Sequence, residues 1–217
     1  MEIRTIQPFL HYFGNVRERT MRVARCIPPD KLDWSYAPGK FTLGDLLRHI
    51  AVAERFMWAE TLQGRTSRYT THGKELADCY DNVIAFMEQL HAESMEIFAK
   101  LDDEDLQRKC KTADGAEITK WKWLRLMVEH EIHHRGQIYL YLGILGVPTP
   151  PMYGLTSEQV RAQQRRINCC RKGLTVRRKM APTKDLEAAG ALRSCHRAGP
   201  PRPDRVSRAT GSVRWRA

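Results

Sequence analysis

The stretch MVEHEIHHRGQIYLYLGILG, residues 127–146, carries a clear helical pattern and places two histidines on its apolar face. An α-helix advances about 100° and 1.5 Å per residue, so His130 and His134 lie about 40° and roughly 6 Å apart. Both therefore point to where a core is expected, whereas His133 lies about 100° from the centre of this face. The apolar residues that share the face are Trp123, Met127, Ile138, Tyr141 and Leu145.

Three further segments show apolar residues at the same helical spacing. Little of the chain has the alternating pattern of β-strands. Four long amphipathic helices with weak strand signal predict an all-α fold, a four-helix bundle. The predicted helices are residues 5–27, 43 to about 63, roughly 76–101 and 119 to about 145.

Local signals mark the ends of several elements. Thr42 with Asp45 resembles a capping box at the start of the second helix. Thr156 with Gln159 predicts a short fifth helix after the bundle. The connection over residues 102–119 is long and contains an Asp-Gly turn signal, so a short hairpin is possible there. Long connections also leave room for a helix order other than simple up-and-down.

The positive charge of the chain is concentrated at its C-terminal end. Residues 161–217 contain 16 Lys and Arg against 3 Asp and Glu, whereas residues 1–160 contain 20 against 22. From residue 168 the apolar residues are scattered without a period, which is typical of disorder. We therefore expect a globular domain over residues 1–165 and a disordered basic tail over 166–217.

The basic tail could bind nucleic acid, but it lacks interleaved aromatic residues. Its composition also resembles GC-rich DNA translated in an unintended frame, so its physiological role is in doubt. We favour a functionally silent tail over a nucleic-acid partner.

The chain has six cysteines and no C-x-x-C pair. Its first residues carry charge early and lack the apolar run of a secretory signal. No segment approaches the ~18 apolar residues of a membrane span. Free thiols in a reducing cytoplasm, without a membrane partner, are the simplest interpretation.

A third histidine is predicted to face the same interior, because His49 aligns with Leu46, Ala53 and Met57. A single buried histidine is usually a hydrogen-bonded core residue, since an unpartnered buried nitrogen costs roughly 1–3 kcal/mol. Three histidines that face one interior are better explained by a metal ion. Three protein ligands leave one coordination position for water or substrate, as in catalytic sites.

Residues that flank the histidines are weaker candidates. Glu131, expected at the rim of the site, could be a general base, although we favour a role in orienting a histidine. Arg135 is expected to be a solvated charge or a contact for a substrate carboxylate, and Gln137 to form a hydrogen bond inside the bundle. Four tryptophans are expected to pack rather than to line the mouth of the bundle: Trp34, Trp58, Trp121 and Trp123.

Residues 130–134 also match the H-E-x-x-H pattern of zinc proteases. The longer pattern H-E-x-x-H-x-x-G-x-x-H fails, because position 137 is Gln and position 140 is Leu. Glu158 is a candidate third ligand, but it follows a proline-rich crossover. A five-residue match arises easily by chance, so we disfavour a protease.

The segments APGKFTLGDLLRHIAVAE (37–54) and MVEHEIHHRGQIYLYLGILGVPTPPMYG (127–154) resemble the DinB/YfiT-like family of metal-binding four-helix bundles. The likeness covers about residues 5–160, and the basic tail is not part of the family pattern. The most specific parts are the second-helix histidine and the H-x-x-x-H-R-x-Q block. The resemblance implies a divalent metal held by His49, His130 and His134.

The resemblance also implies a class of function. Characterised relatives include transferases that use bacillithiol or mycothiol and a mycothiol-dependent isomerase, and many members form dimers. We therefore expect a metal-dependent thiol S-transferase or hydrolase that acts on a small molecule, with a low-molecular-weight thiol as candidate partner and a homodimer as candidate assembly. Zinc is the first choice of metal, with nickel or iron as alternatives. The alternative function is a non-catalytic metal-binding protein of the stress response.

Overall fold

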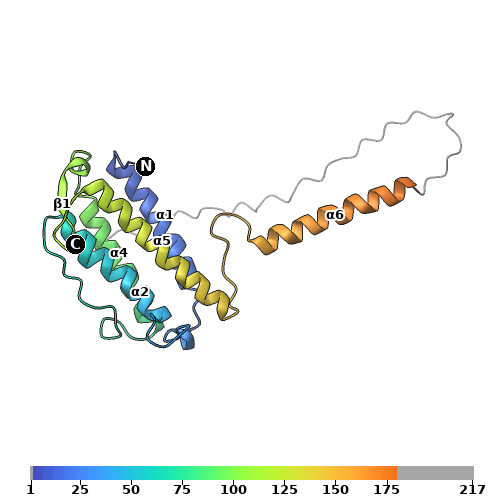
Figure 1. Cartoon of the computed structure of the whole chain (residues 1–217), viewed down its shortest axis with the longest axis horizontal. Coiled ribbons are helices and arrows are strands. Elements are labelled where there is room, and N and C mark those ends of the chain that lie inside the picture. The colour runs from blue at the N-terminus through green and yellow to red at the C-terminus, as the bar shows by residue number, and fades with distance from the viewer. Residues whose placement is uncertain (1, 180–217) are drawn as a thin grey trace, which may run out of the picture. The chain divides into compact units, whose positions relative to one another are not determined.

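The computed structural model describes residues 2–179 and contains the helices that the sequence predicts (Figure 1). The bundle belongs to a compact unit that ends at Arg165. In chain order, the elements are α1 (Ile6–Ala24), η1 (Pro29–Lys31), α2 (Leu43–Val52), η2 (Ala53–Trp58), α3 (Ala59–Leu62), α4 (Tyr80–Phe98), η3 (Asp105–Gln107), β1 (Lys109–Lys111), β2 (Glu117–Thr119), α5 (Lys120–Ile144) and α6 (Ser157–Lys179).

The predicted four-helix bundle is confirmed, and its helix order is not simple. Both α1 and α2 pack against α4 and α5, as Figure 1 shows for α1 beside α5. Therefore α1 and α2 lie diagonally across the bundle, whereas an up-down-up-down bundle would place consecutive helices side by side. The connections over residues 25–42 and 99–119 are long because they join helices on opposite corners.

Each long helix buries its predicted apolar stripe in the centre of the bundle. Phe13 of α1, Leu46 of α2, Met87 of α4 and Ile138 of α5 are fully buried. Removing one such side chain from water contributes about 1.5–3 kcal/mol to stability. This burial explains why apolar residues recur at three- and four-residue intervals in the sequence.

The second helical segment contains a π-turn. The predicted capping box is present, since Asp45 N–H donates to Thr42 Oγ1 and Thr42 N–H donates to Asp45 Oδ2, both at 3.0 Å. The helical run covers the predicted residues, but the π-helix η2 interrupts it between α2 and α3. A π-turn changes the rotation per residue, and both Glu54 and Trp58 of η2 are buried.

The third helix is shorter than predicted, and the hairpin is present. Cys79 has a φ of 59°, in the left-handed region, so α4 begins only after it. In the hairpin, β1 pairs with β2 in antiparallel orientation, and Cys110 lies opposite Ile118. Gly115 supplies the positive φ, +89°, that the turn between the strands requires.

The fifth helix begins where the sequence predicts. Gln159 N–H donates to Thr156 Oγ1 at 3.2 Å, and Thr156 N–H donates to Gln159 Oε1 at 2.9 Å. The helix continues to Lys179, so it is longer than expected, and part of the segment expected to be disordered is helical. Helix-favouring Arg, Gln and Lys dominate this segment. The rest of the predicted tail, residues 180–217, lies outside the described residues.

Among the described helices, none is long and apolar enough to cross a membrane.

Candidate metal centre

The structure brings His49, His130 and His134 together between α2 and α5. Nε2 of His130 lies 2.9 Å from Nε2 of His49 and 3.1 Å from Nε2 of His134. One ring nitrogen of each histidine lies within 4.8 Å of the corresponding atoms of the other two. All three side chains are half-buried. The faces that the helical wheel selected therefore meet at one point.

The spacing of these nitrogens fits a metal ion. A tetrahedral zinc ion with imidazole nitrogens at about 2.0–2.1 Å separates its ligand atoms by about 3.3 Å, close to the two measured separations. A neutral imidazole carries a single N–H. When that proton is on Nδ1, Nε2 can only accept, so three converging Nε2 atoms of this kind cannot form hydrogen bonds with one another. Three neutral nitrogen donors suit zinc, nickel and iron.

The environment of the cluster keeps the imidazoles neutral. Burial, reinforced by His134 and His72, lowers the pKa of His49 to about 4. Burial, reinforced by the other clustered histidines and His133, lowers the pKa of His130 to about 3. Burial also lowers the pKa of His134. The neutral ring, with a lone pair on one nitrogen, is the form that binds metal.

Hydrogen bonds to the outer ring nitrogens direct two of the histidines toward the common point. Nδ1 of His49 lies 2.8 Å from the Tyr69 hydroxyl, and Nδ1 of His134 lies 2.7 Å from Gln137 Oε1. The Gln137 carbonyl oxygen only accepts, so His134 carries its proton on Nδ1 and presents the lone pair of Nε2. The hydrogen bond expected of Gln137 is therefore present.

Phe41 and Trp58 supply apolar aromatic surface beside the cluster. The Phe41 ring lies 5.4 Å from the His49 ring and 6.5 Å from the His134 ring, centroid to centroid. The Trp58 ring lies 4.8 Å from the His130 ring. Apolar surface on these sides limits the access of water to the ring nitrogens.

The tryptophans mainly pack, as expected. Trp34 packs edge-on against Tyr141 with ring centroids 5.5 Å apart. Trp123 is buried and donates its Nε1–H to Thr61 Oγ1 at 2.8 Å. Trp121 packs at the edge of the core, and of the four tryptophans in the described part of the chain only Trp58 combines core packing with a place beside the histidines.

Glu131 faces α1 and not the rim of the site, which corrects the position expected from the sequence. Its side chain is buried, its Oε1 accepts from Thr20 Oγ1 at 2.6 Å, and its Oε2 lies 3.1 Å from Arg17 Nη2. Within the described chain it makes no hydrogen bond to the three clustered histidines. The zinc-protease pattern requires a glutamate that faces the metal, so this geometry argues against a protease.

Arg135 is also buried, which corrects its expected place at the surface. Its Nη1 donates to the Val16 carbonyl at 3.1 Å, and its Nη2 donates to the Tyr153 hydroxyl at 3.2 Å. The helical wheel allowed α5 one buried stripe, but α5 packs against both α1 and α2. Its buried arc is therefore wider than one stripe and includes Glu131 and Arg135.

A buried network of charges, not anticipated from the sequence, links four helical segments. Arg17 of α1 forms ion pairs with Glu54 of η2 and Glu131 of α5. Nδ1 of His91 on α4 lies 2.9 Å from Glu54 Oε1. The side chains of Arg17, Glu54 and Glu131 are at most 5 % exposed. Arg17 follows the buried Phe13 by four residues, which places both on the same face of α1. This spacing was the one feature of the sequence from which the burial of Arg17 could have been predicted.

The remaining histidines lie outside the cluster. His11 and His133 are exposed, and His91 joins the charged network. The His72 ring centroid lies 5.7 Å from that of His49. His196 lies beyond the part of the chain that the structure describes.

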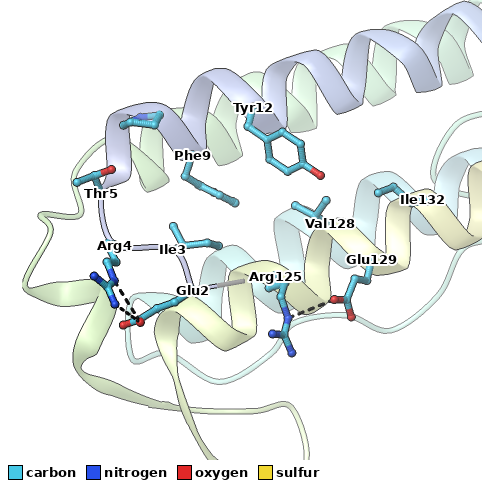
Figure 2. A pocket seen from close by; sticks show the side chains of 11 residues that line it. Glu2, Ile3, Arg4, Thr5, Phe9, Tyr12, Arg125, Val128, Glu129 and Ile132 are labelled. Atoms are coloured by element: carbon cyan, nitrogen blue, oxygen red, sulfur yellow. Dashed lines mark hydrogen bonds and ion pairs between the residues drawn. The ribbon is translucent and has the colours of Figure 1, made fainter. Parts of the chain in front are cut away.

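A surface pocket of about 420 Å³ opens between the N-terminal residues, the start of α1 and one face of α5 (Figure 2). None of the three clustered histidines lines it, so we assign it no part in the chemistry of the site. Two ion pairs of 3.2 Å border it, Arg4–Glu2 and Arg125–Glu129. Its apolar lining includes Ile3, Phe9, Val128 and Ile132.

Known proteins are similar to this chain in sequence. The model of the DinB family matches residues 3–166. The uncharacterized protein YjoA of Bacillus subtilis strain 168 is 26% identical over 150 residues, which cover 65% of this chain and 92% of YjoA.

Solved structures share the fold. A DinB-like protein from Bacillus cereus ATCC 10987 superposes with a TM-score of 0.61 and 21% identity, covering 69% of this chain and 99% of that one. YfiT from Bacillus subtilis, described as "a probable metal-dependent hydrolase with an unusual four-helix bundle topology", gives a TM-score of 0.54 and 20% identity, covering 66% and 89%. The family model spans the whole bundle, and this chain therefore belongs to the DinB family.

Proposed function

We propose that His49, His130 and His134 bind one divalent metal ion, and that the chain is a metal-dependent enzyme that acts on a small molecule. The convergence of their Nε2 atoms, with separations of 2.9 and 3.1 Å, carries this proposal. Core histidines that served packing alone would pair each nitrogen with a donor or acceptor of the fold. Here three Nε2 atoms face one another in a half-buried site, and an ion would satisfy all of them in the tautomers that carry the proton on Nδ1.

Zinc is the metal we favour, with nickel or iron as alternatives. Imidazole nitrogen is a preferred ligand of all three metals, and the site offers neither carboxylate nor thiolate among its three converging side chains. Three protein ligands leave a position for a reactant. The spacing fits the tetrahedral geometry that zinc adopts most readily.

The reaction we propose is thiol transfer or hydrolysis. A bound divalent metal supplies a positive charge that lowers the pKa of a thiol or water. The protein's own side chains keep the ligand imidazoles neutral and oriented, and Phe41 and Trp58 exclude water beside them.

A low-molecular-weight thiol is the nucleophile we favour. Glu131 is committed to Arg17 and Thr20, and Glu129, the other carboxylate of α5, is exposed and paired with Arg125, so neither is placed to take a proton from water at the site. A thiol with a pKa of about 8.5 needs far less assistance than water at about 15.7. The description of YfiT, which shares the fold, keeps hydrolysis as the second possibility.

The alternative is a non-catalytic metal-binding protein of the stress response. The same three histidines would then hold the metal with the remaining position closed by the protein or by a permanent ligand. A metal-loaded chain that binds no thiol and turns over no substrate would favour this alternative.

The surroundings that we propose for the protein are the cytoplasm, without a membrane or nucleic-acid partner. Cys26, Cys79 and Cys110 are free thiols, which suits a reducing compartment. A homodimer is the assembly that we propose, because Leu140 and Ile144 of α5 are 62% and 57% exposed and offer apolar surface.

Metal content tests the proposal. We would purify the protein without a histidine tag and measure metals by elemental analysis in the wild type, His130→Ala and His133→Ala. His133 is a matched control, since it lies on the same helix but is exposed. We expect about one metal per chain in the wild type and the control, and almost none in His130→Ala. A wild type that binds none of zinc, nickel and iron on addition contradicts the proposal.

Assays on the metal-loaded protein separate the two reactions. Thiol transfer to an activated electrophile and hydrolysis of an activated ester or amide would be compared between the wild type and His130→Ala. Activity that disappears with the metal supports an enzyme. A protein that binds metal but shows neither activity would favour the non-catalytic alternative.

A further inference from the structure

The loop of residues 63–79, between α3 and α4, reaches the histidine cluster through one tyrosine. The Tyr69 hydroxyl lies 2.8 Å from Nδ1 of His49 and 3.1 Å from Nδ1 of His72. It therefore bridges a cluster histidine on α2 and a histidine of the loop itself. No helical period marks Tyr69 in the sequence, so only the folded chain reveals this contact.

We infer that Tyr69 is the positioning residue of His49, and that His72 sets the direction in which the Tyr69 hydroxyl donates. This inference rests on the proposed metal site. A histidine that binds a metal through Nε2 carries its proton on Nδ1, so His49 donates to the Tyr69 oxygen. The Tyr69 hydroxyl then donates to Nδ1 of His72.

The direction of this chain follows from the number of protons. Tyr69 has one hydroxyl proton and can donate it to only one of its two neighbouring nitrogens. A tyrosine hydroxyl ordinarily keeps its proton at neutral pH, since its reference pKa is about 10. When His72 accepts that hydrogen bond, the Tyr69 oxygen accepts from His49, and Nε2 of His49 keeps its lone pair for the metal.

Contacts of Arg68, just before Tyr69, attach the loop to η2 and α3. The Arg68 N–H donates to the Phe56 carbonyl of η2 at 2.7 Å. The Arg68 side chain donates through Nη2 to Glu60 Oε1 of α3, also at 2.7 Å. Backbone and side chain of Arg68 together fix the position from which Tyr69 extends toward His49.

Contacts after Tyr69 attach the loop to α2. Arg48 is fully buried, its Nε donates to the His72 carbonyl at 3.0 Å, and its Nη1 donates to the Ala77 carbonyl at 3.2 Å. Arg48 precedes His49 directly in the sequence. One helix therefore supplies both a cluster histidine and the anchor for the residues that orient it.

The arrangement around His49 matches the one around His134. Gln137 Oε1 accepts from Nδ1 of His134 as the Tyr69 oxygen accepts from Nδ1 of His49. Phe41 covers the loop side, with its ring centroid 4.4 Å from that of His72. A hydrogen bond shielded from water is electrostatically stronger than an exposed one, which favours a fixed orientation of the ring.

Metal affinity and the cobalt spectrum test the role of Tyr69. The full chain would be stripped of metal and titrated with cobalt(II) and zinc(II) in competition with a chromophoric chelator. The variants are Tyr69→Phe, His72→Leu and, as a matched control, Tyr139→Phe, which removes a hydroxyl from a half-buried tyrosine of α5. Urea unfolding of the metal-free proteins would show whether each variant folds.

We expect Tyr69→Phe to bind both metals about 10- to 100-fold more weakly and to shift the visible cobalt bands. His72→Leu should weaken binding in the same direction, because the Tyr69 hydroxyl is then free to donate to His49 and to favour the wrong tautomer. Tyr139→Phe should match the wild type. A folded Tyr69→Phe variant with wild-type affinity and spectrum overturns this inference alone, whereas a wild type that binds no metal overturns the proposed metal site with it.

Discussion

The Nε2 atoms of His49 and His130 lie 2.9 Å apart, although 81 residues separate these histidines in the chain. Their contact depends on α2 and α5 being neighbours in the bundle, which follows from the diagonal placement of α1 and α2. Most of the surrounding interior positions are filled by aliphatic and aromatic side chains. Polar nitrogens at such a place require a partner, and the metal ion that we propose would satisfy all three histidines.

The stability of the metal-free protein should fall as the pH falls below about 6.5. In the unfolded chain, histidines take up protons near that pH, but in the fold the pKa of His49 is about 4 and that of His130 about 3. Between pH 6.5 and these values the unfolded state binds more protons, so the free energy of unfolding decreases. Urea midpoints of the metal-free protein between pH 8 and pH 5 measure this slope.

The variant His130→Gln keeps the other titrating groups but lacks one clustered histidine. The slope of its urea midpoint against pH should therefore be smaller than that of the wild type over the same range. His133→Gln removes an exposed imidazole that makes only the smallest contribution to the lowered pKa of His130, so its slope should stay closer to the wild type than that of His130→Gln. Equal slopes in all three proteins would show that the cluster does not resist protonation.

The ion pairs of Arg17 should contribute strongly to stability. Arg17→Met leaves the carboxylates of Glu54 and Glu131 buried without their cation, and breaking such a pair costs about 3–5 kcal/mol. Arg25→Met is the control, because Arg25 and Glu88 are more than half exposed, and exposed pairs contribute about 0–1 kcal/mol. Urea denaturation of both variants at pH 7 measures the difference, and equal losses would contradict the role of the buried network.

Glu131 should support the fold and not the metal. Glu131→Gln keeps the shape of the side chain but weakens its contacts with Arg17 and Thr20, at a cost of about 1–3 kcal/mol. The metal content at neutral pH should remain that of the wild type. A Glu131→Gln variant that loses metal without losing stability would indicate instead that Glu131 takes part in the metal site.

Gln137 should raise metal affinity through His134. Gln137→Leu removes the acceptor of the His134 Nδ1 proton, and loss of such an outer contact typically weakens metal binding about 10- to 100-fold. Gln89→Leu, on the exposed face of α4, is the control and should have no effect. Isothermal titration with zinc in a competing chelator resolves the two results.

The sequence predicted the bundle and the meeting of the three histidines because both depend on helical periodicity. His49, His130 and His134 occupy positions of the apolar stripes, and stripes must face one another to be buried. The inference required only that each helix be regular around its histidines, which the structure confirms for α2 and α5.

The sequence did not reveal the surroundings of the histidines, because these depend on which helices become neighbours. Glu131 and Arg135 are buried since α5 contacts α1 as well as α2, and a wheel for one helix contains no such information. Tyr69 contacts His49 from a loop without a period. The π-turn of η2, which buries Glu54, has no signal in a pattern based on 3.6 residues per turn.

The most direct test is a crystal structure of the zinc-loaded protein with anomalous diffraction data collected at the zinc absorption edge. We expect one strong anomalous peak at about 2.0–2.1 Å from Nε2 of His49, His130 and His134, with no contact to His133 or Glu131. A peak at other residues, or three histidines hydrogen-bonded to one another in a crystal soaked with zinc, would contradict it.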